Sequence, residues 1–292
     1  MIKVRKFGHA TFETTDLEKA VEYYTQVNGL ALAVREKNRA FLATRTGVLS
    51  VQLEQASQAR CARLAFELDP EADFAAIRRQ LSEEGIRCQE HHGVSPAIPR
   101  MLSFMDPNGT VIELFSEWKY LGAWRDGVGV GPLKLGHVAF FAPDPRLIAE
   151  FYQRVLGFRI SDWIEDFFVF MRCNPDHHSV NFVRGEKVRM HHIAFELKDI
   201  AHIGNSCDIL ARHKTPLVWG PLRFGPGHNI AAFHRDQDGQ LVEFYAELDQ
   251  LKDEHLGYFD PRPWHRDMPQ RPKIWNRQDD PIWGPPPPAN FM

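Results

Sequence analysis

Three residues in the second half of the chain have the types and positions needed to hold a metal ion. His137 and His192 lie in short runs that read as strands, and Glu243 lies in a third such run. Two imidazoles and one carboxylate on different strands of a cupped sheet can occupy one triangular face of a metal and leave the opposite positions open, which suits Fe(II) dioxygen chemistry. The sequence therefore predicts a non-haem metal site at these residues.

An internal repeat gives each of these residues a counterpart in the first half. Four segments match in the same order at a nearly constant offset: 7–12 with 135–140, 48–53 with 177–182, 63–68 with 192–197, and 106–113 with 236–243. Collinear self-similarity over about a hundred residues indicates a duplicated unit. We therefore expect two tandem domains.

The two copies differ at the predicted metal ligands. The N-terminal counterparts of the three residues are His9, Arg63 and Glu113. An arginine stays protonated near neutral pH and has no lone pair to give to a metal. The prediction is therefore a metal site in the C-terminal half and an N-terminal copy that has lost it.

A further histidine, His178, has an ordinary strand residue, Leu49, as its counterpart. A histidine that titrates near neutral pH can relay protons beside a metal, so we predict that His178 is a catalytic acid/base. The alternative is an exposed histidine in the turn at residues 174–178. His191 precedes a predicted ligand, and the alternation of a strand directs it to the opposite face, where it either supports His192 or packs.

The spacing of apolar residues predicts an α+β fold. Each half reads as two βαβββ modules, and the pair is expected to form an open, barrel-like sheet. Aspartates precede helical stretches at 17–27, 74–85, 145–157 and 200–213. We expect an N-terminal domain at 1–120, a Gly-rich linker at 121–132, a C-terminal metal-binding domain at 133–247, and an arm at 248–292. The arm is rich in Pro and Trp, and it either packs on the domain, packs on a neighbouring subunit, or covers the active site.

Composition excludes several classes of protein. The 292 residues carry a formal net charge of -3, and no basic run tracks a phosphate backbone, so nucleic-acid binding is not expected. No stretch approaches the roughly 18 apolar residues of a membrane span. The four cysteines form no CxxC pair, which favours reduced thiols in a cytoplasmic protein.

Four motifs of the C-terminal half carry a resemblance to a known family. In order, LGHVAF (135–140), CNPDHHSVNF (173–182), MHHIAFEL (190–197) and DQDGQLVEF (236–244) resemble the type I extradiol catechol dioxygenases of the vicinal oxygen chelate superfamily. The resemblance spans residues 1 to about 247. It implies Fe(II), occasionally Mn(II), bound by His137, His192 and Glu243, with His178 as the acid/base residue. It also implies ring opening of a small aromatic diol by dioxygen beside its two hydroxyls, and assembly as a homo-oligomer.

The sequence departs from the family pattern at two positions. Phe224 replaces a histidine that contacts the substrate, and Phe233 replaces a tyrosine whose hydroxyl faces it. Two other readings therefore stay open: a metal-dependent lyase, isomerase or hydrolase that stabilises an oxyanion, and a non-catalytic binding protein. His228, His234 or Tyr245 can compensate for the lost polar groups only if they face the same cavity. The residues predicted to line the substrate pocket are His191, Phe224, His228, Phe233, Tyr245, Trp163 and Phe168.

Overall fold

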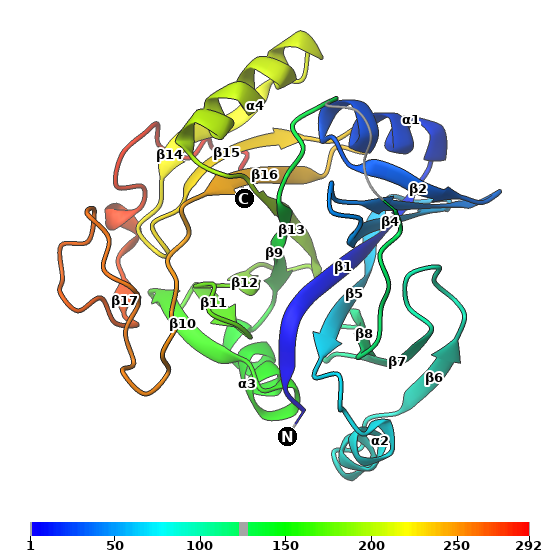
Figure 1. Ribbon diagram of the computed structural model, residues 1–292. Coiled ribbons are helices and arrows are strands. Elements are labelled where there is room, and N and C mark those ends of the chain that lie inside the picture. The colour runs from blue at the N-terminus through cyan, green and yellow to red at the C-terminus, as the bar shows by residue number, and fades with distance from the viewer. Residues whose placement is uncertain (1, 123–127, 292) are drawn as a thin grey trace.

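The computed structural model describes residues 2–122 and 128–291, so residues 123–127 of the predicted linker lie outside the described part of the chain. Seventeen strands and four α-helices are assigned within it, and they form one sheet of eight strands and one of nine. The predicted α+β fold with two tandem domains is confirmed. Figure 1 shows the two curved sheets side by side, with β1 and β9 near the centre of the molecule.

Both halves repeat the order strand, helix, three strands, strand, helix, three strands. The N-terminal half contains β1 (Val4–Thr14), α1 (Leu17–Glu22), β2 (Ala31–Arg35), β3 (Arg39–Ala43), β4 (Leu49–Gln55), β5 (Arg60–Leu68), α2 (Phe74–Glu83), β6 (Cys88–His92), β7 (Arg100–Met105) and β8 (Val111–Phe115). The C-terminal half contains β9 (Lys134–Ala142), α3 (Pro145–Leu156), β10 (Arg159–Ile164), β11 (Phe168–Arg172), β12 (Val180–Arg184), β13 (Arg189–Glu196), α4 (Ile200–Arg212), β14 (Leu217–Arg223), β15 (Ile230–Arg235) and β16 (Leu241–Ala246).

The order of the strands shows how each sheet is built from two modules. In the N-terminal sheet it is β2-β3-β4-β1-β5-β8-β7-β6, and in the C-terminal sheet β14-β15-β16-β13-β9-β12-β11-β10-β17. The first strands of the two modules, β1 with β5 and β9 with β13, pair antiparallel in the middle. Each sheet therefore presents the middle strands of both modules to one concave face, where side chains from several strands converge.

Local signals in the sequence explain where the helices begin and end. Asp16, Asp73, Asp144 and Asp199 each accept a backbone N–H from the first turn of the helix that follows. Helix α3 ends at Gly157, which adopts the left-handed φ of 74° that a helix C-terminus commonly needs. The predicted helix at 17–27 is instead divided, because α1 gives way to a π-helical turn, η1 (Tyr23–Val27).

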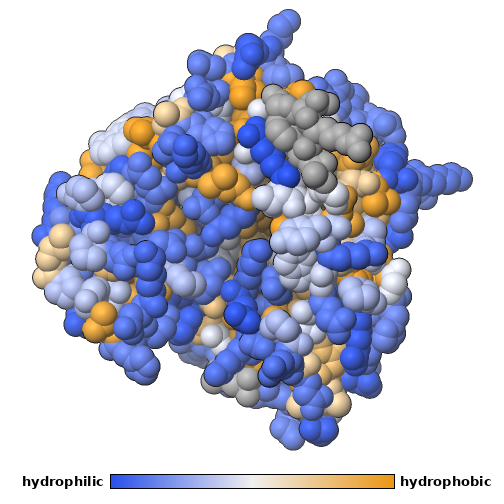
Figure 2. Space-filling model, in the orientation of Figure 1, coloured by the Kyte–Doolittle hydropathy of each residue, from blue (hydrophilic) through white to orange (hydrophobic). Residues whose placement is uncertain are grey.

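The two halves share one apolar core. Its members include Phe12 and Tyr24 from the first half and Phe195 and Phe244 from the second, and all four side chains are fully buried. Tyr23 Oη also lies 2.5 Å from His234 Nε2, across the boundary between the halves. The face shown in Figure 2 is mostly hydrophilic, with apolar side chains in small patches. Because their shared core is apolar, the two halves are held together mainly by the burial of apolar side chains.

Residues 248–291, the arm, pack on the C-terminal domain of the same chain. A two-residue strand, β17 (Ile274–Trp275), runs parallel to β10 at the edge of the sheet, and isolated bridges join Asp176 to Gln250 and Arg223 to Trp283. A short 3₁₀ turn, η2 (Arg277–Asp279), follows. In Figure 1 the arm curves around the outer strands of this domain. No helix in the described ranges is long and apolar enough to cross a membrane.

Candidate metal centre

The pairing of three neighbouring strands brings the predicted ligands together. Ala194 on β13 is paired with His137 on β9 on one side and with Glu243 on β16 on the other. His192 lies two residues before Ala194, and residues two apart in a strand project from the same face. The three side chains therefore point to one place in the concavity of the sheet, although 106 residues separate the first from the last.

The geometry of these side chains fits a metal ion. His137 Nε2 lies 3.0 Å from Glu243 Oε2 and 3.2 Å from His192 Nε2, and His192 Nε2 lies 3.2 Å from the same carboxylate oxygen. Ligand atoms about 2.1 Å from an ion, at right angles to one another, are about 3.0 Å apart. The three atoms thus form one face of an octahedron of ordinary size.

Burial and charge also suit a cation at this place. All three side chains are buried. Burial lowers the pKa of His137, so its imidazole is neutral and keeps a lone pair. Burial alone raises the pKa of Glu243, but the neighbouring His137 and His192 outweigh it and lower that pKa to about 2. The cluster is therefore a carboxylate with a net negative charge beside an uncharged imidazole donor.

Neighbouring side chains hold two of the ligands in place. Asn229 Nδ2 donates to Glu243 Oε1 at 2.9 Å, which leaves Oε2 for the histidines or a metal. His191 Nδ1 lies 2.7 Å from His192 Nδ1. A hydrogen bond there fixes the orientation of the His192 ring. Of the two roles that the sequence left open for His191, support of the ligand is the one this contact favours.

The N-terminal copy of the site is filled by an arginine. Arg63 Nε lies 3.1 Å from Glu113 Oε1, and Arg63 also pairs with Glu54. His9 Nε2 is 3.8 Å from Glu113 Oε2. Burial, together with the positive charge of Arg63, lowers the pKa of His9 to about 3. The guanidinium supplies a positive charge against Glu113 and has no lone pair to offer a metal.

His178 lies beside the cluster at the end of a chain of hydrogen bonds. Its ring centroid is 4.2 Å from that of His137, and its Nδ1 is 3.0 Å from His177 Nδ1, whose ring in turn binds Asp162 Oδ2 through Nε2 at 3.1 Å. A carboxylate only accepts, so His177 donates through Nε2 and accepts through Nδ1 from His178. A neutral His178 then has its lone pair on Nε2.

The pKa of His178 agrees with this arrangement. Burial, followed by the nearby His137 and His177, lowers the pKa of His178 well below its usual value. The ring is therefore uncharged at neutral pH and keeps a free lone pair. His178 is also buried, with 3% of its surface exposed. The alternative of a solvent-exposed turn histidine is wrong.

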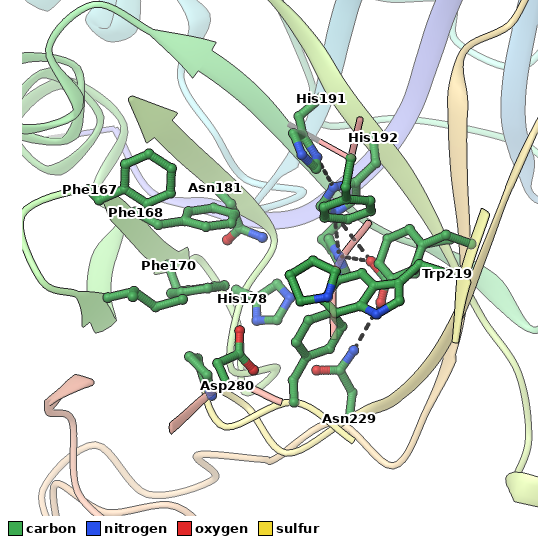
Figure 3. A pocket seen from close by; sticks show the side chains of 18 of the residues that line it. Phe167, Phe168, Phe170, His178, Asn181, His191, His192, Trp219, Asn229 and Asp280 are labelled. Atoms are coloured by element: carbon green, nitrogen blue, oxygen red, sulfur yellow. Dashed lines mark hydrogen bonds and ion pairs between the residues drawn. The ribbon is translucent and has the colours of Figure 1, made fainter. Parts of the chain in front are cut away.

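One cavity contains the metal cluster and His178. It encloses about 240 Å³, somewhat below the roughly 300–1,000 Å³ of most ligand sites. Figure 3 shows His192 and Trp219 on one side and Phe167, Phe168 and Phe170 on the other. The residues that line it outside the cluster are Ile164, Phe167, Phe168, Phe170, His178, Asn181, His191, Trp219, Phe224, Pro226, Asn229, Phe233, Arg277, Asp280, Pro287 and Phe291.

Three residues predicted for the substrate pocket lie outside this lining. Trp163 is on β10, where it packs under the Arg146 guanidinium. His228 Nδ1 is 2.7 Å from Asp249 Oδ2, in a separate buried cluster. Tyr245 is fully buried behind His137, with ring centroids 5.0 Å apart, and it fits there because residue 136 is a glycine. These placements correct the prediction. Tyr245 projects from the same face of β16 as Glu243, but its ring fills the space beside Gly136 and His137 and leaves no surface in the cavity.

None of the three residues suggested to replace the polar groups lost at Phe224 and Phe233 lines the cavity. His228 is bound to Asp249 and His234 faces Tyr23, while the Tyr245 hydroxyl is buried and forms no hydrogen bond within the described part of the chain. Phe224 and Phe233 do line the cavity, with ring centroids 6.0 Å apart. The cavity wall is thus apolar at both positions where the family pattern has a polar group.

Sequence reasoning missed several residues of the cavity. Asn181 and Asn229 are on or next to strands with ordinary apolar patterns, and a lone asparagine gives no signal of its own. Arg277, Asp280 and Phe291 come from the arm, far along the chain from the predicted ligands. Only the folding of the arm over the domain brings them there.

Comparison with known proteins places the duplication within a family. The profile of the glyoxalase/bleomycin resistance protein/dioxygenase superfamily matches residues 6–114 and again 134–244. The chain belongs to this superfamily. The two matches also coincide with the two halves of the repeat, each centred on one of the sheets.

Relatives within the superfamily are distant but cover most of the chain. The chain is 26% identical to metapyrocatechase 2 from Cupriavidus necator, over 85% of this chain and 82% of that protein. It is 24% identical to a manganese-dependent 2,3-dihydroxybiphenyl 1,2-dioxygenase from Geobacillus genomosp. 3, over 94% of each chain.

Solved structures show the same fold. The Mn(II)-bound glyoxalase from Novosphingobium aromaticivorans aligns with a TM-score of 0.86 at 23% identity, over 99% of this chain and 94% of that one. Homoprotocatechuate 2,3-dioxygenase from Brevibacterium fuscum, in complex with 3,4-dihydroxyphenylacetate, aligns with a TM-score of 0.83 at 23% identity, over 99% and 92%. At this identity the likeness establishes the fold alone.

Proposed function

We propose that the protein is a metal-dependent dioxygenase that opens a catechol-type aromatic ring beside its diol. The observation that carries the proposal is the meeting of His137, His192 and Glu243 on one face, beside His178, in a cavity of the size of one substituted ring. The names of the relatives support it, since they include ring-cleaving dioxygenases that depend on iron or manganese.

His137, His192 and Glu243 are the residues that would hold Fe(II) or Mn(II). When bound, such an ion supplies positive charge that favours ionisation of the diol, and open positions for two reactants. The protein's own part begins with Glu243, whose orientation Asn229 fixes through Oε1. His191 does the same for His192. Both contacts keep the ligands in place before any reactant arrives, which lowers the cost of reorganisation.

His178 is the residue proposed to move protons. Its Nε2 carries the lone pair in the neutral ring, because Nδ1 is engaged by His177. It is thus suited to take a proton from a diol hydroxyl and to return it to an oxygen of the product later in the reaction. Asp162 is held by Trp275 Nε1 and by the Lys273 backbone N–H, both at 2.7 Å. The arm therefore anchors the far end of this chain of hydrogen bonds.

The aromatic walls position the ring and exclude water. Phe170 lies 5.2 Å from the His178 ring, and Phe233 lies 5.6 Å from the His192 ring, centroid to centroid. Apolar rings on both sides of the metal cluster confine a flat substrate. With less water in the cavity, charges and hydrogen bonds act more strongly on the reacting groups.

A second function keeps the metal but not the reaction with dioxygen. Phe224 and Phe233 give the cavity no polar group at the two family positions, and the fold is equally that of a glyoxalase. A lyase, isomerase or hydrolase of this superfamily would stabilise an oxyanion with the same ligands.

Oxygen consumption separates the two functions. Protein loaded with Fe(II) or Mn(II) is incubated with a panel of catechols while dissolved oxygen and the visible absorbance of ring-opened products are followed. Oxygen uptake in a one-to-one ratio with catechol loss supports the dioxygenase. Conversion of a ligand under anaerobic conditions, with Zn(II) as effective as Fe(II), would instead favour the second function.

Assembly and location remain predictions. The family resemblance predicts a homo-oligomer, and the cysteine pattern of the sequence predicts a cytoplasmic protein. Sedimentation of the purified chain tests the first of these, and fractionation of the producing cells tests the second.

A further inference from the structure

Two polar side chains of the cavity have hydrogen-bonding capacity that the protein does not use. Asn181 is 1% exposed, and neither its Oδ1 nor its Nδ2 has a hydrogen-bond partner. Asp280 Oδ1 accepts the Gly225 backbone N–H at 2.9 Å, and no bond to its Oδ2 is formed among the residues that the structure describes. In Figure 3 both side chains point into the cavity, Asn181 from beside Phe168 and Asp280 from below His178.

The cation nearest in sequence to Asp280 is already engaged. Arg277 lines the same cavity, but its Nε lies 3.2 Å from Glu165 Oε2 and its guanidinium lies 3.9 Å from the centre of the Phe167 ring. Across the described ranges, Asp280 forms no ion pair with any basic side chain. Burial raises the pKa of Asp280 to about 6, which leaves the group mostly ionised at neutral pH.

Polar atoms that lack hydrogen bonds in an apolar cavity are destabilising unless a ligand forms hydrogen bonds with them. A buried polar group without a hydrogen bond, such as the Asn181 amide, is destabilising, and the half-buried carboxylate of Asp280 is partly desolvated as well. Asp280 faces a cavity lined by phenylalanine rings, and a carboxylate among aromatic faces suits a cationic or hydroxylic group. The amide of Asn181 can both donate to such a group and accept from it.

We propose that Asp280 and Asn181 bind the ring substituent of the substrate, and that this substituent ends in a hydrogen-bond donor, either an ammonium or a hydroxyl group. This inference rests on the proposed function, since it places a catechol in the same cavity. The cavity of about 240 Å³ limits the substituent to a short chain. The enzyme from Brevibacterium fuscum is known with 3,4-dihydroxyphenylacetate, whose side chain is a carboxylate. Asp280 selects against that charge.

Four catechols that differ only at the end of a two-carbon side chain test the proposal. They are 4-(2-aminoethyl)catechol, 4-(2-hydroxyethyl)catechol, 4-ethylcatechol and 3,4-dihydroxyphenylacetate. The metal-loaded chain is expected to show the highest kcat/KM with the amine or the alcohol, and the lowest with the carboxylate. The first two compounds distinguish a cationic donor from a neutral one.

Asp280→Asn is the informative variant, because the amide oxygen can still accept the Gly225 N–H while the charge is lost. We expect kcat/KM to fall about 10- to 100-fold for the amine, the size of one charge-assisted hydrogen bond, and to change less than about threefold for 4-ethylcatechol. Asn181→Leu should lower kcat/KM for the amine and the alcohol with little effect on 4-ethylcatechol. The matched control is Asp279→Asn, since Asp279 is the neighbouring carboxylate and does not line the cavity.

Two results would overturn the proposal. One is an equal change of kcat/KM for all four compounds in Asp280→Asn, which indicates a structural role. The other is a wild-type preference for 3,4-dihydroxyphenylacetate.

Anaerobic calorimetry of the metal-loaded protein with the same compounds separates this proposal from the ring-cleavage function. Absence of oxygen uptake with all four would count against ring cleavage, while tighter binding of the amine or alcohol than of 4-ethylcatechol would still support the roles of Asp280 and Asn181; equal binding would refute them.

Discussion

The hydrogen bond from Asn229 to Glu243 offers a direct test of the proposed metal centre. Asn229 Nδ2 donates to Oε1 at 2.9 Å, and both side chains are buried. Leucine has nearly the same size and shape but no donor. In Asn229→Leu, Glu243 Oε1 loses this partner in a buried place, so the pKa of Glu243 should rise and the carboxylate should be free to rotate. A larger fraction of Glu243 is then protonated, so the metal ion has to displace a proton from this carboxylate and to reorient it.

The magnitude follows from the number and kind of bonds lost. One hydrogen bond to a charged group is removed, which is worth about 1.5–3 kcal/mol when buried. At 1.4 kcal/mol for each factor of ten, the dissociation constant for Fe(II) or Mn(II) should rise about 10- to 150-fold. Changes to residues that support metal ligands commonly cost 10- to 100-fold in affinity, which is the same range. The loss should grow as the pH falls.

Competition with a chelator of known affinity measures the constant, and metal content after gel filtration gives a second reading. Asn181→Leu is the matched control, because it makes the same chemical change in the same cavity but removes no hydrogen bond to Glu243. Its metal affinity should equal that of the wild type. The reasoning is refuted if Asn229→Leu, folded as judged by circular dichroism, binds the metal within about threefold of the wild type at every pH.

Four further predictions concern the site and the stability of the fold. His178→Phe should retain metal and lose about 10²- to 10⁴-fold in turnover, since it removes one proton-transfer group; unchanged turnover would exclude His178 from the reaction. His192→Arg copies the N-terminal site, so it should pair with Glu243 and abolish metal binding while the fold persists, as read by metal content and thermal melting. Phe233→Tyr should preserve or increase oxygen uptake with catechols, and a pronounced loss would indicate a cavity adapted to other chemistry. Burial lowers the pKa of His9 and His234 to about 3, so these residues stay neutral in the fold while the unfolded chain takes up protons below about pH 6.5. The free energy of unfolding should therefore fall as the pH drops from about 6.5 towards 3, by roughly 4 kcal/mol for each histidine, and His234→Gln should flatten that slope in urea titrations.

Much of the fold could be predicted because its signals are local and occur twice. Apolar spacing and capping aspartates predict the four helices, and the repeat predicts the same module order in both halves. The short strand β6 gave no signal, since its residues CQEHH are mostly polar and half-exposed. The π-helical turn after α1 was also not predicted, because the sequence LEKAVEYYTQV has the same apolar spacing in either kind of helix.

The cluster of His137, His192 and Glu243 is the part of the proposed site that the sequence by itself predicted. The repeat aligns these residues with strand positions, and Arg63 in the other copy has no lone pair for a metal, so chemistry and register together point to the C-terminal half. Of the residues predicted for the substrate pocket, Phe168, His191, Phe224 and Phe233 do line the cavity, but its other walls were decided by the tertiary structure. Trp163, His228 and Tyr245 point elsewhere, while Asn181 and Asp280 point in. The physical reason is that a strand fixes only the alternation of its side chains, whereas the walls of a cavity depend on which distant segments, here the arm, fold over it.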